Sequence, residues 1–191
     1  MPHLHKALSL PAIWRQTVYF LQKIRPQNLH LNNLTDPKIY EKITFESVRQ
    51  LIEKIFQGQN TVSNLNLGPD SIHKFAELSG IDLKWRPILN WGNCFEDNTY
   101  EYSVQDFLEI AFAKVKPSSG ETIILTSECF KDEMAFSIFN FKDVIQFMDV
   151  VYPNLFDMQF PQPSDFIFIQ PDIDLITMIQ HEGVRTKYCR S

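Results

Sequence analysis

Apolar residues in the first 80 positions recur at three- and four-residue spacing, a pattern typical of amphipathic helices. We expect the first helix to begin at Ser9 and to end at Arg25-Pro26, because the residue before a proline disfavours helical backbone. A short helix is expected to follow, opened by Thr35-Asp36-Pro37. The chain therefore begins with a predicted helical region.

Two further helices are expected before residue 80. Thr44 and Asp70 are suited to cap their first turns, and Gly58 and Gly80 supply the left-handed residue at which helices commonly stop. The expected buried faces consist of Phe45, Val48, Leu51, Ile52, Ile55 and Phe56 in one helix and of Ile72, Phe75, Ala76 and Leu78 in the other. Each helix thus needs a second surface to pack against.

Residues 81–191 supply that surface as a series of short β-rich runs. Pro87 marks the first run as an edge strand or a bulge, because proline cannot donate to a strand ladder. Gly183 lies between the last two runs at a position typical of a hairpin turn. The expected strands cover 83–89, 122–126, 134–139, 166–169, 175–180 and 184–189, with loops at 91–99 and 117–120 and a charged turn at 128–133.

Two helical patterns interrupt these runs. Ser103 and Asp106 have the spacing of a capping box, followed by the apolar positions Phe107, Leu108, Ala111 and Phe112. Asn140 and Asp143 are expected to open a second helix that carries Phe141, Val144, Ile145, Met148 and Val151. Three prolines, at 153, 161 and 163, are then expected to hold an extended connection.

These elements predict a single α+β domain over residues 1–191, with a helical subregion at 1–80 and a sheet-containing subregion at 81–191. The sheet is expected to be largely antiparallel, with two helices packed on one face. The helices of the first subregion are expected to cover the other face or to lie beside the sheet.

Composition supports a folded chain. Apolar residues make up 44% of the sequence, and the 13% aromatic fraction includes 16 phenylalanines, enough for a large core. The longest apolar runs are far shorter than the roughly 20 residues that span a bilayer, and the N-terminal residues do not resemble a signal peptide. Three widely spaced cysteines argue against a disulfide scaffold. These features predict a cytoplasmic protein without a membrane segment.

Charge is distributed unevenly along the chain. Residues 1–80 carry 9 basic and 6 acidic residues, whereas residues 81–191 carry 9 basic and 17 acidic residues. The acidic part is unsuited to nucleic acid, because a polyanion would meet a repelling field. It suits a basic protein partner, since opposite charge accelerates encounter. The alternative interpretation is that the negative charge only keeps the protein in solution.

One segment combines acids with aromatic residues, and no Lys or Arg lies between Arg86 and Lys114. Aromatic anchors beside carboxylates are typical of an interface with a cationic partner. The alternative is that the rings point inward and the acids complement the positive end of the following helix. The predicted partner-binding residues are Trp91, Glu96, Asp97, Tyr100, Glu101, Tyr102, Asp106 and Glu109, with Phe95 beside them and the acidic turn of Glu128, Asp132 and Glu133 as an extension if the two are adjacent.

Catalytic interpretations compete with the interface. Carboxylates and an imidazole near the last hairpin have the ligand types of a metal-dependent hydrolase, namely Asp165, Asp172, Asp174, His181 and Glu182. Against this, the aspartates have the spacing of turn residues, and no second His follows His181-Glu182. Cys94 or Cys129 with His73 or His181 would form a nucleophile pair, but neither cysteine has a local signature. We expect no catalytic residue, resident metal or cofactor, and the six scattered glycines form no phosphate-binding loop.

In overall character the chain resembles the immunity proteins of bacterial polymorphic toxin systems. The resemblance is carried by the acidic stretch 96–109 and by the runs Glu121-Thr-Ile-Ile-Leu-Thr, Asp165-Phe-Ile-Phe-Ile and Gln180-His-Glu-Gly-Val. It implies a small acidic α/β or α+β protein that binds a cognate toxin domain and blocks it. A basic, nuclease-like toxin acting in the cytoplasm is the implied partner. A structural or regulatory subunit of a complex stays open as an alternative.

Overall fold

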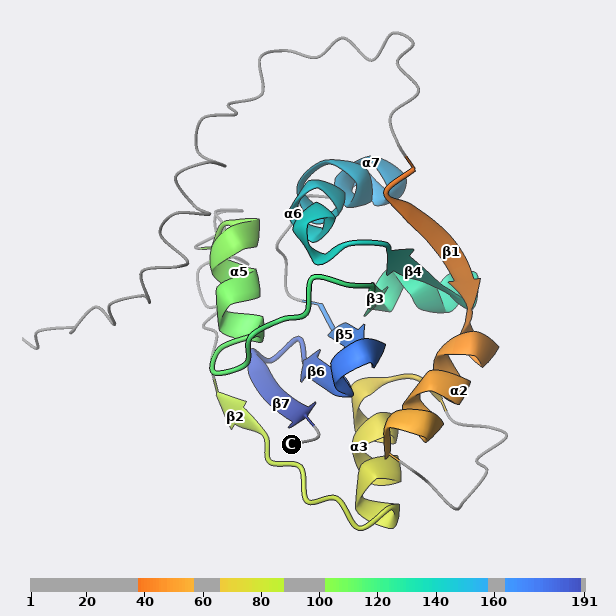
Figure 1. Ribbon diagram of the computed structural model, residues 1–191, viewed down its shortest axis with the longest axis vertical. Helices are drawn as coiled ribbons and strands as arrows, with labels where there is room; N and C mark the ends of the chain where they lie inside the picture. Colours follow the sequence, from red (N-terminus) through yellow and green to blue (C-terminus); the bar gives the residue numbers. More distant parts are fainter. Residues whose placement is uncertain (1–37, 57–65, 88–101, 158–163, 190–191) are drawn as a thin grey trace, which may run out of the picture. The chain divides into compact units, whose positions relative to one another are not determined.

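A computed structural model describes residues 38–56, 66–87, 102–157 and 164–189, which belong to one compact unit that begins at Lys38 (Figure 1). The predicted helix from Ser9 to Pro26 lies outside the described residues. The centre of the unit is a seven-stranded sheet in the order β1-β4-β3-β5-β6-β7-β2, and every neighbouring pair is antiparallel. The strands are β1 (Tyr40–Thr44), β2 (Arg86–Pro87), β3 (Thr122–Thr126), β4 (Met134–Ile138), β5 (Phe166–Gln170), β6 (Leu175–Ile179) and β7 (Val184–Cys189).

The three central strands are buried along their whole length, so both faces of the sheet are covered. Successive side chains of a strand point to opposite faces, and residues paired across strands share a face. Through the registers, one face carries Phe136, Phe168 and Arg185, and the other carries Ile169 and Tyr188. We call these the first and the second face.

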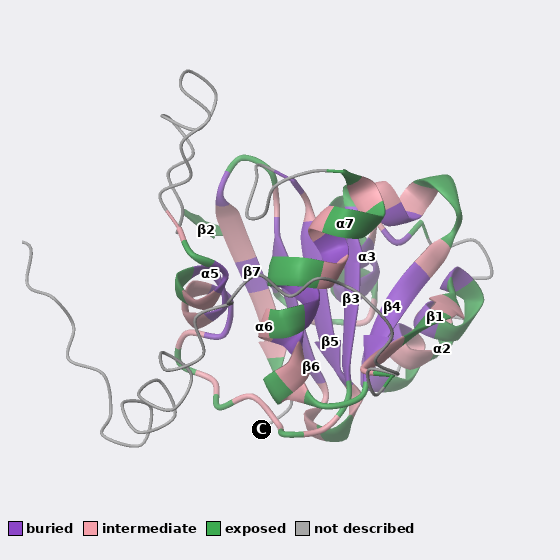
Figure 2. Cartoon of the chain, turned by 90° about the horizontal axis from the view of Figure 1, so that it is seen from above, coloured by how far each residue is buried: buried purple, intermediate pink, exposed green. Residues whose placement is uncertain are grey.

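Two helical segments cover the first face: α5 (Val104–Ala111) and a continuous segment at residues 141–156. The ring of Phe107 on α5 lies 5.0 Å from that of Phe166, and Phe147 of the other segment lies 5.0 Å from Phe136. Figure 2 shows the buried strands behind the partly exposed helical segment at 141–156. The prediction of two helices packed on one face is confirmed.

The second face is covered by α2 (Phe45–Phe56) and α3 (Pro69–Leu78). Phe56 packs on Tyr188 of β7 with 5.1 Å between ring centroids, and it also contacts Phe75 of α3 at 5.9 Å. Of the two arrangements expected for the earlier helices, these two therefore cover the second face. The result is an α+β fold with an antiparallel sheet between two helical layers.

Local signals explain where several elements begin. The Thr44 hydroxyl accepts the Ser47 amide at 3.3 Å, so Thr44 caps α2 as predicted. The Ser103–Asp106 capping box is present in full, with the Asp106 amide donating to the Ser103 hydroxyl at 3.1 Å. Gly183 closes the β6–β7 turn with a φ of 80°, a backbone conformation that favours glycine.

The short helix predicted after Thr35-Asp36-Pro37 is wrong where the structure describes the chain, because residues 40–44 form the edge strand β1. All five residues pair with β4, from Tyr40 opposite Ile138 to Thr44 opposite Met134. Only two of them are half-buried, so the apolar pattern was too weak to identify a strand. The pairing partner, about 95 residues away in sequence, decides the conformation.

Three details of the other helices also differ from the predictions. Asp70 lies inside the first turn of α3, whose N-cap is Gly68, and Leu78 is 63% exposed instead of buried. The helical segment at 141–156 runs through Pro153 to Phe156, where an extended chain was expected. A π turn at Phe147–Val151 precedes this proline, which lies in the first turn of α7 (Tyr152–Phe156), where a missing N–H is tolerated, and the Asn154 side-chain Nδ2 donates to the Val150 carbonyl at 2.7 Å.

Candidate functional site

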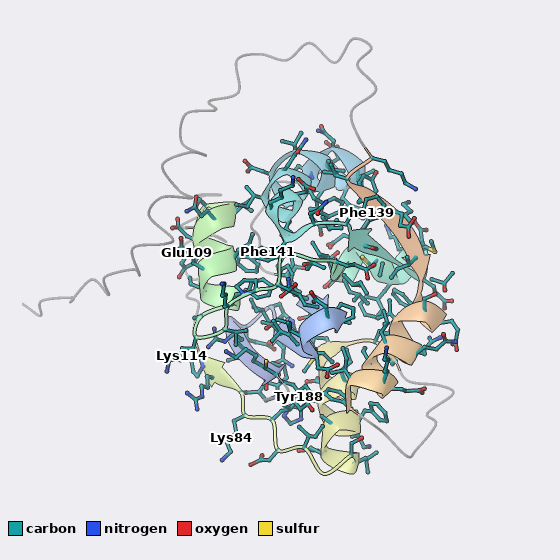
Figure 3. The ribbon with its side chains drawn as sticks, in the orientation of Figure 1. Lys84, Glu109, Lys114, Phe139, Phe141 and Tyr188 are labelled. Carbon is teal, nitrogen blue, oxygen red and sulfur yellow. The ribbon has the colours of Figure 1, made fainter. Side chains whose placement is uncertain are left out.

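Five of the eight predicted partner-binding residues, Trp91, Glu96, Asp97, Tyr100 and Glu101, lie outside the described residues. Of the other three, Tyr102 is half-buried against the core. Asp106 is exposed but accepts hydrogen bonds from the Ser103 amide and hydroxyl, at 3.3 and 2.7 Å. Glu109 accepts from Gln105 at 3.3 Å on the outer side of α5 (Figure 3). Asp106 therefore has a capping role in addition to any contact with a partner.

The acidic turn after β3 lies at the same end of the sheet as the start of α5. The last residue of β3, Thr126, pairs with Phe166, and Phe107 of α5 packs on that same Phe166. The turn's Asp132 and Glu133 are exposed, whereas Glu128 is partly buried and accepts the Tyr152 hydroxyl at 2.5 Å. The turn thus lies at the same end of the sheet as Asp106, but the Glu133 carbonyl accepts the Phe45 amide of α2, beside β1, whereas α5 is bonded to β7 across the sheet.

The proposed metal cluster is not assembled. His181 contacts Asp165 through Nδ1 and Glu182 through Nε2, both at 3.0 Å. Asp172 and Asp174 lie at the other end of β5, roughly 17 Å of strand away, and Asp172 accepts the Ser118 hydroxyl. Within the described residues, no three His, Cys, Asp or Glu side chains are placed to share a metal ion. The hydrolase hypothesis therefore has no geometric basis in the part of the chain that the structure describes.

The proposed cysteine–histidine nucleophile pairs are likewise not supported by the described residues. Cys129 is buried, and burial raises the pKa of its thiol, which is the opposite of what a nucleophile needs. His73 stacks on Trp85 at 5.4 Å and contacts the Leu83 carbonyl at 2.9 Å, so its ring supports the chain between α3 and β2. Cys94 lies outside the described residues.

The described chain also contains a pocket lined mainly by cations, which sequence reasoning missed. It has a volume of about 430 Å³ and lies where β2, β7 and the C-terminal end of α5 meet. Figure 3 shows Lys84 and Lys114 on this side of the molecule. We call it the basic pocket; its lining residues are Asp82, Lys84, Arg86, Lys114, Arg185 and Lys187.

The pairing of two strands brings these cations together. Arg86 of β2 is directly opposite Arg185 of β7, on the first face of the sheet. Lys84 lies two residues before β2 and lines the same pocket as Lys187 of β7. Like charges directly opposite each other are unfavourable in an antiparallel pair. The lone carboxylate among the lining residues, Asp82, pairs with Lys84 at 3.4 Å.

The end of α5 holds two of the cations in place. Arg185 donates to the Ile110 carbonyl, and the Lys187 ammonium donates to the Ala113 carbonyl at 2.9 Å. These carbonyls belong to the negative end of the helix, where cations are favoured. Burial lowers the pKa of Arg185 and of Lys187, and the neighbouring guanidiniums lower them further. Two of the pocket's cations are thus held in position by backbone carbonyls, and the cations of the pocket repel one another.

Lys114 contributes a fifth cation from an unusual backbone conformation. It follows the C-terminal turn of α5 with a φ of 68°, a region that glycine normally occupies at helix ends. A side chain in this conformation costs roughly 1–2 kcal/mol. Lysine at this position is therefore unfavourable for the fold alone.

The sequence signal for this pocket is weak but present. Lys84 and Arg86, like Arg185 and Lys187, alternate with other residues at a spacing of two, so each pair lies on one face of its strand. Lys84 and Arg86 lie within the expected strand 83–89, of which the structure forms only Arg86–Pro87. Nothing local indicates that two pairs about 100 residues apart become neighbours.

Comparison with models of protein families, with curated proteins and with solved structures finds no match to this chain. None of the described helices is both long and apolar enough to cross a membrane. The fold itself defines the class, an α+β protein whose antiparallel sheet is covered on both faces.

Proposed function

We propose that this protein is a binding protein of the immunity type, which blocks a basic, nuclease-like toxin in the bacterial cytoplasm through an acidic and aromatic surface. The surface includes the predicted partner-binding residues and the turn after β3. The observation that carries the proposal is that exposed carboxylates of α5 and of this turn lie at the same end of the sheet.

The frame around this surface supports the proposal. The segment 88–101 begins after β2, which pairs with β7, and ends before α5, which packs on β5 through Phe107. The two elements that flank the acidic and aromatic segment thus belong to the same sheet or pack on it.

The proposed mechanism is electrostatic. A nuclease binds phosphate with Lys and Arg side chains, and carboxylates on a rigid protein can occupy the same positions. Close charge pairs at such interfaces couple by roughly 1.5–7 kcal/mol, and acidic patches accelerate association with a cationic target. Aromatic residues in the same segment would contribute the buried anchors of the interface.

The test is co-purification with the product of a neighbouring toxin-like gene, followed by a nuclease assay with and without this protein. The variant Glu96→Gln, Asp97→Asn, Glu101→Gln is expected to lose at least tenfold in affinity, since one charge-assisted contact is worth more than 1.4 kcal/mol. The matched control is Glu53→Gln, Asp149→Asn, Asp157→Asn, which removes the same charge elsewhere. Equal losses in both variants, or no complex with the wild-type protein, would refute the proposal.

A second candidate, a structural or regulatory subunit, is favoured by one observation. Val150 and Leu155, on the helical segment at 141–156, are 51% and 43% exposed. Exposed apolar side chains mark protein–protein contacts where they form a contiguous patch. Light scattering at tens of micromolar (a range in which contacts of about −6 to −7 kcal/mol are detected) tests self-association, and a monomer would count against it.

A further inference from the structure

We propose that the basic pocket binds a small ligand that carries several phosphate groups. The proposal does not rest on the acidic surface or on the immunity-type function, because it uses different residues. Five cationic side chains from three separate elements line one pocket against a single carboxylate, a formal surplus of four positive charges.

The arrangement of the cations is the first argument. Arg86 opposite Arg185 is an unfavourable contact for a strand pair, and three lysines, Lys84, Lys114 and Lys187, line the same pocket. Within the described residues neither Arg86 nor Lys114 has an ion-pair partner. An anion between the two strands' side chains would convert this repulsion into attraction.

Preorganisation is the second argument. The backbone carbonyls of Ile110 and Ala113 hold Arg185 and Lys187, so two donors are positioned before any ligand arrives. Lys84, Arg86 and Lys114 are exposed and can adapt to a bound group. A rigid pair of donors with adaptable partners lowers the entropic cost of binding.

Lys114 is the third and independent argument. Its backbone adopts the left-handed conformation in which glycine would be the stable choice, and its side chain lines the pocket. Strained backbone of this kind is concentrated at ligand sites. The presence of lysine at this strained position is explained if binding at the pocket needs its ammonium group.

Size and charge identify the class of ligand. A volume of about 430 Å³ is within the range of small-molecule sites, roughly 300–1,000 Å³, and exceeds what one phosphate requires. Guanidinium groups bind phosphate oxygens in a two-pronged geometry, and two of them face each other here. Residues 81–191 are net acidic, so a long polyanion would meet repulsion outside the pocket, whereas a small one would not.

The experiment is calorimetric titration of the full chain with inorganic triphosphate, ATP, citrate and a single-stranded oligonucleotide at constant ionic strength. We expect one triphosphate per chain, bound at least tenfold more tightly than citrate, because citrate lacks the tetrahedral oxygens that the guanidiniums grip. Equal affinity for triphosphate and ATP assigns recognition to the phosphates alone, and tighter ATP binding assigns it to a nucleotide.

Variants then test the location. Arg86→Gln combined with Lys114→Gln is expected to weaken triphosphate binding about tenfold or more, since two charged contacts are lost. The control Lys74→Gln with Lys142→Gln removes the same charge from exposed lysines elsewhere and should change affinity less than twofold. Thermal unfolding of each variant tests whether it folds. Lys114→Gly provides a second binding variant, in which the side chain is removed and the left-handed backbone conformation is preserved.

Three outcomes would overturn the proposal. They are the absence of saturable triphosphate binding at millimolar concentration, equal losses in the pocket and control variants, and tighter binding of the oligonucleotide or of citrate than of triphosphate. Loss of triphosphate binding in the pocket variant with unchanged toxin inhibition would leave the immunity-type function standing, so the two proposals fail separately.

Discussion

Arg86 and Arg185 lie directly opposite each other in the β2–β7 pairing, at the far edge of a seven-stranded sheet. Two guanidinium groups in this relationship repel each other, and β2 consists of only two residues. The edge strand is therefore held less firmly than its neighbours in the absence of a ligand. This relationship leads to the first of four predictions.

The substitution Arg86→Gln should stabilise the ligand-free protein, because it removes a like-charged cross-strand pair. The expected gain is about 0.2–1 kcal/mol in the free energy of unfolding at low salt. Thermal or chemical unfolding at two salt concentrations measures it, and the gain should shrink at high salt. The control Lys74→Gln should have little effect. A destabilised Arg86→Gln protein would show that the pair is not repulsive in solution.

Lys114→Gly should separate stability from binding. Glycine relieves the left-handed backbone at a φ of 68°, so we expect a gain of about 1 kcal/mol in the free energy of unfolding. The same variant should bind triphosphate more weakly, because it removes one of the five cations. Lys116→Gly, two residues further on, serves as control and should not stabilise. A loss of stability in Lys114→Gly would contradict the strain argument.

His181 should titrate above its ordinary value. Its hydrogen bond to Asp165 raises the pKa above 6.5; burial lowers the pKa by less, and the charges of Glu182, Asp165 and Asp70 make smaller contributions that raise it. A raised histidine pKa means that the interaction stabilises the fold fully below pH 6.5 and is lost as the pH rises through the folded-state pKa. The effect on stability should be small, because the His181 side chain is 62% exposed.

Proton NMR of the imidazole measures this pKa directly. Asp165→Asn should bring it down toward 6.5, and Glu182→Gln should lower it less, because the hydrogen bond to Asp165 makes the larger contribution. Asparagine keeps an oxygen that can accept the His181 backbone amide, which donates to Asp165 at 3.0 Å. An unchanged pKa in Asp165→Asn would show that the hydrogen bond is not formed in solution.

Tyr152→Phe should destabilise the fold without disturbing its packing. The buried hydroxyl donates to Glu128 at 2.5 Å and contacts the Thr126 hydroxyl at 3.1 Å. Its removal leaves two polar partners without this contact, at a cost of about 1–3 kcal/mol. Denaturant unfolding measures the loss, with Tyr40→Phe at the half-buried edge strand as control. Equal effects of the two substitutions would contradict a special role for the buried hydroxyl.

The same hydroxyl has a pH signature. Burial and the Glu128 carboxylate raise the pKa of Tyr152, so it stays protonated in the folded state where an unfolded tyrosine would ionise, near pH 10. Its contribution to stability is therefore present below pH 10 and is lost as the pH rises further. Ultraviolet titration of the wild type should detect a tyrosine that ionises only when the protein unfolds in alkali. This tyrosine should be missing from the titration of Tyr152→Phe.

Elements with short-range signals were predicted well from sequence. The capping box of Ser103 and Asp106, the cap at Thr44 and the turn at Gly183 each depend on residues within three or four positions. The central strands consist mainly of apolar and β-branched residues, so they were recognisable as β-rich runs. These features require no knowledge of where other parts of the chain lie.

Prediction failed where the cause was distant in sequence. Residues 40–44 became a strand because β4 offers hydrogen bonds to all five of them, although their own pattern is ambiguous. The carboxylates and imidazole near the last hairpin looked like a cluster in sequence, but β5 separates Asp165 from Asp172. An extended strand separates the residues at its two ends by about 3.4 Å per residue, and composition alone does not reveal this separation.

The amino-acid sequence by itself determined the α+β class, the antiparallel strands and the helix caps, because these depend on local periodicity and on side chains that bond to nearby backbone. Only the tertiary structure decided that two lysine–arginine pairs, about 100 residues apart, line one pocket with Lys114. The physical reason is that strand pairing sets the register between distant segments, and the register alone puts Arg86 opposite Arg185.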